Sequence, residues 1–84
     1  MSLDLSENAI GDAGACALAA SPILARVRTL ELSHGQIGDA GARALVESPY
    51  LRHVSTLFLH ENAFPELAIA RLRARFGAAL YVGE

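Results

Sequence analysis

The sequence predicts an α/β solenoid of about three repeats, each of roughly 27 residues, with a parallel sheet on one face and helices on the other. Two observations lead to this fold class. The segment Leu-Asp-Leu-Ser at 3–6 returns as Leu-Glu-Leu-Ser at 30–33 and as Leu-Phe-Leu-His at 57–60, with the same spacing both times. In addition, sixteen positions are identical when residues 3–29 are aligned with residues 30–56. Repeats of this length are supersecondary units that bury their apolar faces by stacking on one another.

The same period divides the chain, which at 84 residues has room for a single domain over 1–84. We expect units at 3–29, 30–56 and 57–77, followed by a capping strand at 79–82. The third unit departs from the other two after Phe64, where Pro65 and Glu66 replace the Gly-Asp pair.

Each unit is expected to start with a strand. The Leu-x-Leu pattern alternates with period two, and a β-branched threonine precedes it at Thr29 and Thr56. This pattern is typical of a short, half-buried strand. The leucines should therefore lie inside the molecule, and the residues between them should point outward.

Each unit is expected to continue with an alanine-rich helix. Asp12 and Asp39 stand where an N-cap belongs, and Pro65 should occupy the first position of the third helix, where its missing N–H is not needed. A Ser-Pro pair should end each of the first two helices, because a residue before proline is pushed out of the α region. Gly77 should end the third helix in a left-handed conformation.

The residues around the second strand follow the pattern Val27-x-x-Leu30-x-Leu32-x-x-Gly35-x-Ile37, which returns from Val54 to Phe64. This pattern resembles the leucine-rich repeat. The long helical version, Ile-Gly-Asp-Ala-Gly-Ala-x-Ala-Leu, is similar to the ribonuclease-inhibitor-like class, and residues 71–77 are similar to the ends of bacterial leucine-rich repeat proteins. The resemblance implies a right-handed solenoid whose concave sheet, or the loops at its strand ends, binds another protein.

One position departs from the family motif. The family's asparagine is present as Asn8 and Asn62, but the middle unit has Gly35 instead. In the family this side chain bonds the backbone of adjacent loops, so the resemblance implies that the row of asparagine contacts is interrupted here.

The outward residues of neighbouring strands should form rows, because parallel strands lie about 4.8 Å apart. The first row changes from acidic to aromatic along the sheet: Asp4, Glu31, Phe58, Tyr81. Aromatic residues are enriched at interface hot spots, and the partner-binding residues are therefore expected to be Glu31, Phe58, His60 and Tyr81. The alternative is that the rings of Phe58 and Tyr81 pack on each other to protect the last edge strand.

We expect no catalytic residue, no metal site and no cofactor. The row of Glu7, His34 and Glu61 offers imidazole and carboxylate groups but lacks the tight ligand spacing of a zinc site, so a solvated charge ladder explains it better. Cys16 is expected on the outer helix surface with no base beside it, which argues against a catalytic thiol. The prediction is a protein that is not an enzyme.

The only basic cluster of the chain consists of Arg71, Arg73 and Arg75. We expect a solvated outer face on which the last-turn arginines complement the helix dipole. The alternative is a patch that binds acidic groups.

Composition argues against several classes of partner. Apolar residues make up 52% of the chain and the net charge is −2, which is unlike a disordered tail or a phosphate-binding surface, so we expect no nucleic acid. No apolar run reaches the roughly 18–20 residues of a bilayer span, so we expect no membrane partner. A single cysteine and the lack of a basic leader indicate a cytoplasmic location.

Two functions fit these observations. The first is a non-catalytic protein–protein interaction module with an unknown protein partner, within a fragment of a longer repeat protein. The alternative is a structural C-terminal cap of a longer solenoid with no ligand of its own. The first unit lacks a neighbour on one side, and we expect its apolar edge either to form a two-fold homodimer with a second copy or to cause slow aggregation.

Overall fold

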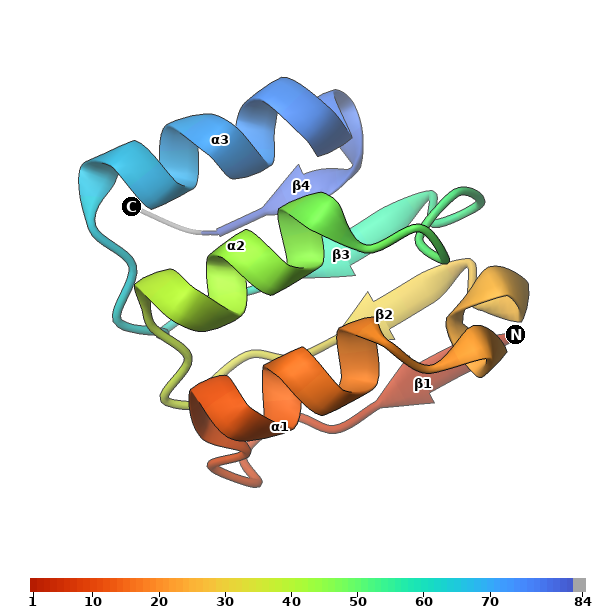
Figure 1. The fold of residues 1–84 in the computed structure, drawn as a ribbon, viewed down its shortest axis with the longest axis horizontal. Helices are drawn as coiled ribbons and strands as arrows, with labels where there is room; N and C mark the ends of the chain where they lie inside the picture. The colour runs from red at the N-terminus through yellow and green to blue at the C-terminus, as the bar shows by residue number, and fades with distance from the viewer. Residues whose placement is uncertain (83–84) are drawn as a thin grey trace.

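The computed structural model describes residues 1–82 as two layers, a parallel sheet and a set of helices that covers one of its faces (Figure 1). The four strands follow one another in the order β1-β2-β3-β4. The elements are β1 (Ser2–Asp4), α1 (Gly11–Ala19), η1 (Pro22–Arg26), β2 (Thr29–Glu31), α2 (Asp39–Glu47), β3 (Thr56–Phe58), α3 (Glu66–Phe76), η2 (Gly77–Ala79) and β4 (Leu80–Tyr81), of which η1 and η2 are short 3₁₀ turns.

The strands stack with the period of the sequence. β1 pairs with β2 through Leu3 and Leu30, and β2 pairs with β3 through Leu30 and Leu57, so each step has the length of one sequence repeat. β4 follows after a shorter step, with Leu80 beside Leu57. The predicted α/β arrangement of a parallel sheet and helices is confirmed, whereas the right-handed course and the number of repeats stay predictions.

The core lies between the two layers and is built from the strand leucines. Fully buried are Leu30, Leu32, Leu57 and Leu59. Their counterparts in the first unit, Leu3 and Leu5, are only partly buried. The difference arises because, within residues 1–82, the first unit has a neighbouring unit on one side only.

The two aspartates do not cap their own helices. Ile10 and Gly38 are the N-cap residues of α1 and α2, and neither helix has a side-chain cap from its own unit. The Asp12 carboxylate instead accepts hydrogen bonds from the backbone N–H groups of Gly38 and Gly41, both at 2.8 Å. Asp39 forms an ion pair with Arg43 at 3.5 Å. The N-cap prediction was wrong because both aspartates lie inside their helices rather than just before them.

The other observed helix ends lie closer to the positions predicted from the sequence. Ser21 and Ser48 are extended, with ψ of 124° and 125°, so the Ser-Pro pairs end α1 and α2 as predicted. Pro65 is the N-cap of α3 rather than its first residue, one position earlier than expected. Gly77 ends α3 at φ 54°, but its ψ of −126° lies outside the left-handed helical region.

The arginines of α3 do not all lie on a solvated face. Arg71 and Arg73 are exposed, whereas Arg75 is partly buried. Its guanidinium donates hydrogen bonds to the carbonyl oxygens of Leu45 at 2.8 Å and Val46 at 2.6 Å, at the C-terminal end of α2. Burial lowers the pKa of Arg75. The prediction of a fully solvated arginine face is therefore wrong at this residue.

Candidate functional site

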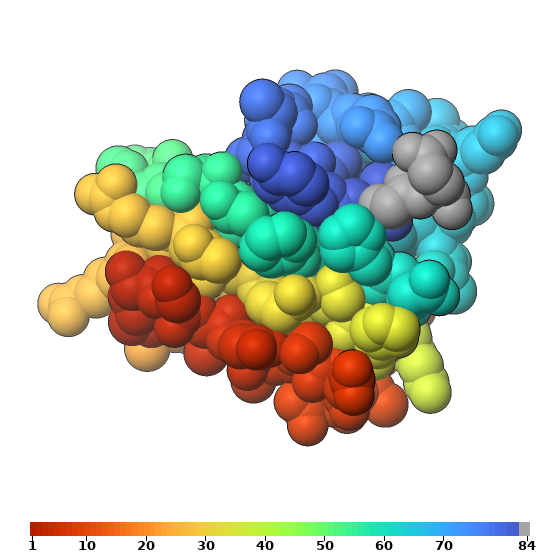
Figure 2. Space-filling model, turned by 180° about the vertical axis from the view of Figure 1, so that it is seen from behind, coloured from red at the N-terminus to blue at the C-terminus, as the bar shows by residue number. Residues whose placement is uncertain are grey.

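The face of the sheet turned away from the helices is the candidate surface. Figure 2 shows the molecule from behind, where the units follow one another as bands from the red N-terminal residues to the blue C-terminal strand. The register places Asp4 beside Glu31, Glu31 beside Phe58 and Phe58 beside Tyr81. The row predicted from strand alternation is thus assembled by the sheet.

Three aromatic side chains gather at the C-terminal end of this face. The ring centroids of Phe58 and Tyr81 lie 5.2 Å apart at an interplanar angle of 31°, and those of Phe58 and His60 lie 6.1 Å apart at 29°. Tyr81 remains 47% exposed, and Phe58 and His60 are partly exposed. Tilted ring pairs of this kind contribute about 0.5–1.5 kcal/mol beyond area burial. We call Phe58, His60 and Tyr81 the aromatic patch.

The acidic end of the row is held by short local hydrogen bonds. The Glu31 carboxylate accepts the N–H of Ser33 at 2.9 Å. In the first unit, Asp4 accepts both the hydroxyl of Ser6 at 2.7 Å and its N–H at 2.9 Å. The bond from the Ser6 hydroxyl and then that from its backbone lower the pKa of Asp4. Both carboxylates are therefore held in one orientation.

The turns after the strands repeat an unusual backbone conformation. Glu7, His34 and Glu61 have φ of 60°, 58° and 57°. Non-glycine residues are uncommon in this left-handed region, and each costs on the order of 1–3 kcal/mol. Among residues 1–82, no group of three His, Cys, Asp or Glu side chains lies close enough to hold a metal ion. Glu7, His34 and Glu61 occupy equivalent turns of the three units and line one edge of the candidate face.

The asparagine of the third unit fixes one of these turns. Asn62 Oδ1 accepts the N–H groups of Gly35 at 2.9 Å and Ile37 at 3.0 Å, and Asn62 Nδ2 donates to the carbonyl of Leu32 at 3.1 Å. Gly35 has no side chain to repeat this contact, and a backbone bond from the N–H of Gly11 to its carbonyl at 2.8 Å joins the first two turns. The predicted interruption at Gly35 is therefore confirmed.

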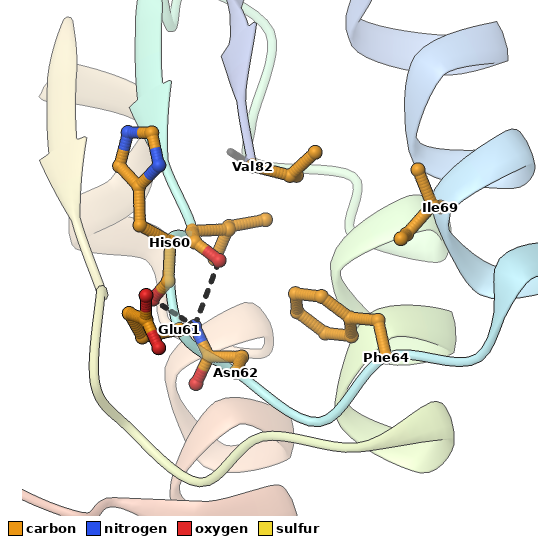
Figure 3. A pocket seen from close by; sticks show the side chains of 7 residues that line it. His60, Glu61, Asn62, Phe64, Ile69 and Val82 are labelled. Atoms are coloured by element: carbon orange, nitrogen blue, oxygen red, sulfur yellow. Dashed lines mark hydrogen bonds between the residues drawn. The ribbon is translucent and has the colours of Figure 1, made fainter. Parts of the chain in front are cut away.

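A cavity of about 350 Å³ adjoins the aromatic patch between the end of β3 and α3. Figure 3 shows Phe64, Ile69 and Val82 around the opening, with His60 and Asn62 on its other side. Phe64, Ile69 and Val82 were not among the predicted site residues. The signal for Ile69 was its size, since it stands one repeat after the smaller Ala42, but an apolar residue at this position is equally consistent with core packing.

Cys16 lies in the helix layer rather than near this face. It is exposed, and its Sγ is 4.0 Å from the carbonyl oxygen of Ala40 in α2. The predicted outer position is confirmed.

A comparison with protein families finds one described as Leucine Rich repeat, whose model matches residues 1–19 and 27–46. The matched segments contain the strand, turn and helix of the first two units. Among the curated proteins, no match was found. None of the helices within residues 1–82 is long and apolar enough to cross a membrane.

Proposed function

Since this chain is a leucine-rich repeat protein, we propose that it is a non-catalytic module that binds another protein through the outer face of its sheet. Leucine-rich repeats generally mediate protein–protein interactions. The proposed contact residues are Glu31, Phe58, His60 and Tyr81. The observation that carries the proposal is the aromatic patch, in which the ring of Phe58 lies near those of His60 and Tyr81 while all three remain at least partly accessible.

Charge supports a specific kind of partner. The candidate face and its edge carry four acidic side chains: Asp4, Glu7, Glu31 and Glu61. Asp4 and Glu31 lie at one end of the row and the rings at the other, which suits a segment in which a basic residue is followed by an apolar or aromatic one. An arginine of such a segment gains both from a carboxylate and from an aromatic face.

The experiment compares proteins retained by the immobilised chain with those retained by the Phe58→Ala/His60→Ala variant. Removing the hot-spot rings should weaken binding of a true partner about tenfold or more. Leu67→Ala is the matched control, because Leu67 is 59% exposed but lies on α3, in the helix layer. Retained proteins are identified by mass spectrometry at a temperature at which circular dichroism shows all three chains folded.

The alternative is a C-terminal cap of a longer solenoid without a ligand of its own. Its support is β4, which covers the edge of β3, together with Arg75, which closes the end of α2. The cap is supported if the Phe58→Ala/His60→Ala variant has a lower free energy of unfolding but retains the same proteins as the unmodified chain. Membership of the ribonuclease-inhibitor-like class, a bacterial origin and a cytoplasmic location belong to the proposal and rest on the sequence alone.

The predicted homodimer concerns a different surface, the open side of the first unit. Leu3 and Leu5 are partly buried there, whereas their counterparts in the second unit are fully buried. Apolar area is thus available for a further contact. The molar mass in solution tests whether a second copy covers it.

A further inference from the structure

The charged side chains of the chain are divided between the two sides of the sheet on which strands end and begin. The segments 4–14, 31–41 and 58–66, which run from the end of each strand into the following helix, contain carboxylates in every unit and no arginine or lysine. The segments 20–28 and 48–55, which lead into β2 and β3, contain arginines and no carboxylate. In Figure 1 these two segments, orange and green, lie on the same side of the molecule as the end marked N.

Hydrogen bonds hold these two segments side by side. The N–H and the hydroxyl of Ser55 both donate to the carbonyl oxygen of Arg28, at 2.7 Å and 3.1 Å. At the other end, the Ser48 hydroxyl donates to the carbonyl of Ala19 at 2.6 Å. Arginines that are far apart in the sequence are therefore brought to one surface.

We call the side chains of this surface, Arg26, Arg28, Arg52 and His53, the basic edge. All four are exposed, and Arg26 and His53 are one repeat apart, so they occupy equivalent positions of neighbouring units. Within residues 1–82, no carboxylate lies within ion-pair distance of the three arginines. Glu47, which directly precedes the second segment, lines a different cavity between α2 and α3. The basic edge thus has its positive charges uncompensated and open to solvent.

A cavity of about 390 Å³ opens between the two segments. It is lined by Ala25 of the first unit and by Pro49, Tyr50, Arg52 and His53 of the second. Ala25 stands one repeat before Arg52, and its small side chain leaves space beside the larger residues of the second unit. The volume is at the small end of the range of about 300–1,000 Å³ typical of ligand cavities, so it suits a single apolar side chain.

The loop that carries the second half of the basic edge is fixed from two directions. Arg75 of α3 donates a hydrogen bond from Nη2 to the carbonyl of Leu51 at 3.3 Å. The Nε of Arg52 donates to the carbonyl of Pro49 at 3.1 Å, which orients its guanidinium and leaves both of its NH₂ groups for a ligand. A site that is already ordered loses less entropy when it binds.

We infer that the basic edge is a second interaction surface, which binds an acidic segment of another protein. Carboxylates of that segment pair with Arg26 and Arg52, and an apolar side chain between them enters the cavity beside Tyr50. Guanidinium groups suit this role because their planar fork matches both oxygens of a carboxylate. This surface is separate from the aromatic patch, and the inference does not depend on the function proposed for that patch.

The charges of the chain argue against two other occupants. A long nucleic acid is disfavoured because the net charge is −2 and the positive side chains span only two units. A second copy would have to offer its own carboxylates, but Asp4, Asp12 and Glu31 already accept hydrogen bonds within the chain. Such a contact between unlike sides would also leave free ends and build an open chain of molecules rather than a closed dimer.

The test selects peptides from a library of random short sequences on the immobilised chain. The enriched peptides should include a class with aspartate or glutamate on both sides of an apolar residue. Fluorescence anisotropy then measures the affinity of one labelled peptide of this class, which should fall about tenfold in Arg26→Gln/Arg52→Gln and also with rising salt. Arg71→Gln/Arg73→Gln is the matched control, since it removes the same charge from exposed arginines of α3 and should leave the affinity nearly unchanged.

Two further changes test the cavity. Glycine in place of the apolar residue of the peptide should weaken binding about tenfold or more, because that side chain would no longer be buried. Ala25→Leu, which fills the cavity without changing the charge, should have an effect of similar size. Phe58→Ala/His60→Ala should not affect the acidic peptides, so this test and that of the aromatic patch can fail separately. Circular dichroism establishes that every variant is folded.

Four results would overturn the inference. The first is a selection without acidic peptides, and the second is an equal loss of affinity in the two arginine double variants. The third is a labelled oligothymidylate of the same charge that binds more tightly than the peptide, which would indicate a nucleic acid. The fourth is a salt-sensitive rise of the molar mass above 8.9 kDa in light scattering that Arg26→Gln/Arg52→Gln abolishes, which would indicate a second copy of the chain.

Discussion

The carboxylate of Asp4 illustrates how a single residue prepares the candidate face. The hydroxyl and the N–H of Ser6 hold the pKa of Asp4 below its ordinary value of 3.8. Glu31 is held in place in a similar way by the N–H of Ser33. A partner with a basic side chain would therefore meet acids whose orientation is already fixed, which reduces the entropy lost on binding.

Substitution of Ser6 tests this arrangement. In Ser6→Ala, the pKa of Asp4 should rise toward 3.8, because the hydroxyl contributes most to its lowering. A lowered carboxyl pKa stabilises the fold above the ordinary value, and this contribution is lost as the pH falls through the lowered pKa. The carboxyl-carbon chemical shift of Asp4, followed by NMR from neutral to acidic pH, measures the midpoint. An unchanged midpoint would contradict the assigned hydrogen bond.

Helix ends are the elements in which neighbouring units are most closely linked. α2 receives a carboxylate from the unit before it and a guanidinium from the unit after it, and neither group belongs to α2 itself. Substitutions at these positions should therefore act across units, and each one has a matched control in the same chain.

Asp12→Ala should lower the free energy of unfolding by about 0.5–2 kcal/mol, the range observed when a helix cap is removed. Asp39→Ala is the control, since its exposed pair with Arg43 should contribute only about 0.3–0.5 kcal/mol. Urea denaturation measures both values, and faster amide exchange at Gly41 should accompany the first change only. Equal losses for the two aspartates would argue against the contact between units.

Arg75→Ala should lower the free energy of unfolding by about 2 kcal/mol, because it leaves the carbonyl groups of Leu45 and Val46 without a charged donor. Arg73→Ala, in the same helix but exposed, should stay within about 0.5 kcal/mol of the unmodified chain. Arg75→Ser should recover part of the loss, since serine at the equivalent position 48 bonds the corresponding carbonyl. The denaturant midpoints of the three variants measure these differences in stability. If Arg75→Ser is no more stable than Arg75→Ala, only the longer arginine side chain reaches α2.

The whole molecule has two unlike ends. At the first unit, Leu3 and Leu5 are only partly buried. Within residues 1–82, the Ser21 hydroxyl forms no hydrogen bond, whereas that of Ser48, one repeat later, donates to the carbonyl of Ala19. At the last unit, β4 pairs with β3, and Tyr81 packs against Phe58. The aromatic patch lies beside this second end, so the proposed partner would bind away from the first unit.

Much of this arrangement was predictable from the sequence because it depends on local periodicity. The repeat period, the inward leucines and the outward row from Asp4 to Tyr81 follow from alternation and from in-register pairing of parallel strands. The ends of α1 and α2 follow from the restriction that proline places on the residue before it.

The packing of the units determines which unit each polar side chain bonds, and the sequence alone does not predict this. Asp12 and Asp39 occupy equivalent positions, yet one caps the next helix and the other pairs with Arg43, because Pro65 has no N–H where Gly38 has one. Two identical pentapeptides, at 10–14 and 37–41, likewise adopt different backbones. Sequence periodicity determines which residues recur in each unit. The groups that a neighbouring unit brings within hydrogen-bonding distance determine which contacts each of these residues forms and which backbone conformation it adopts.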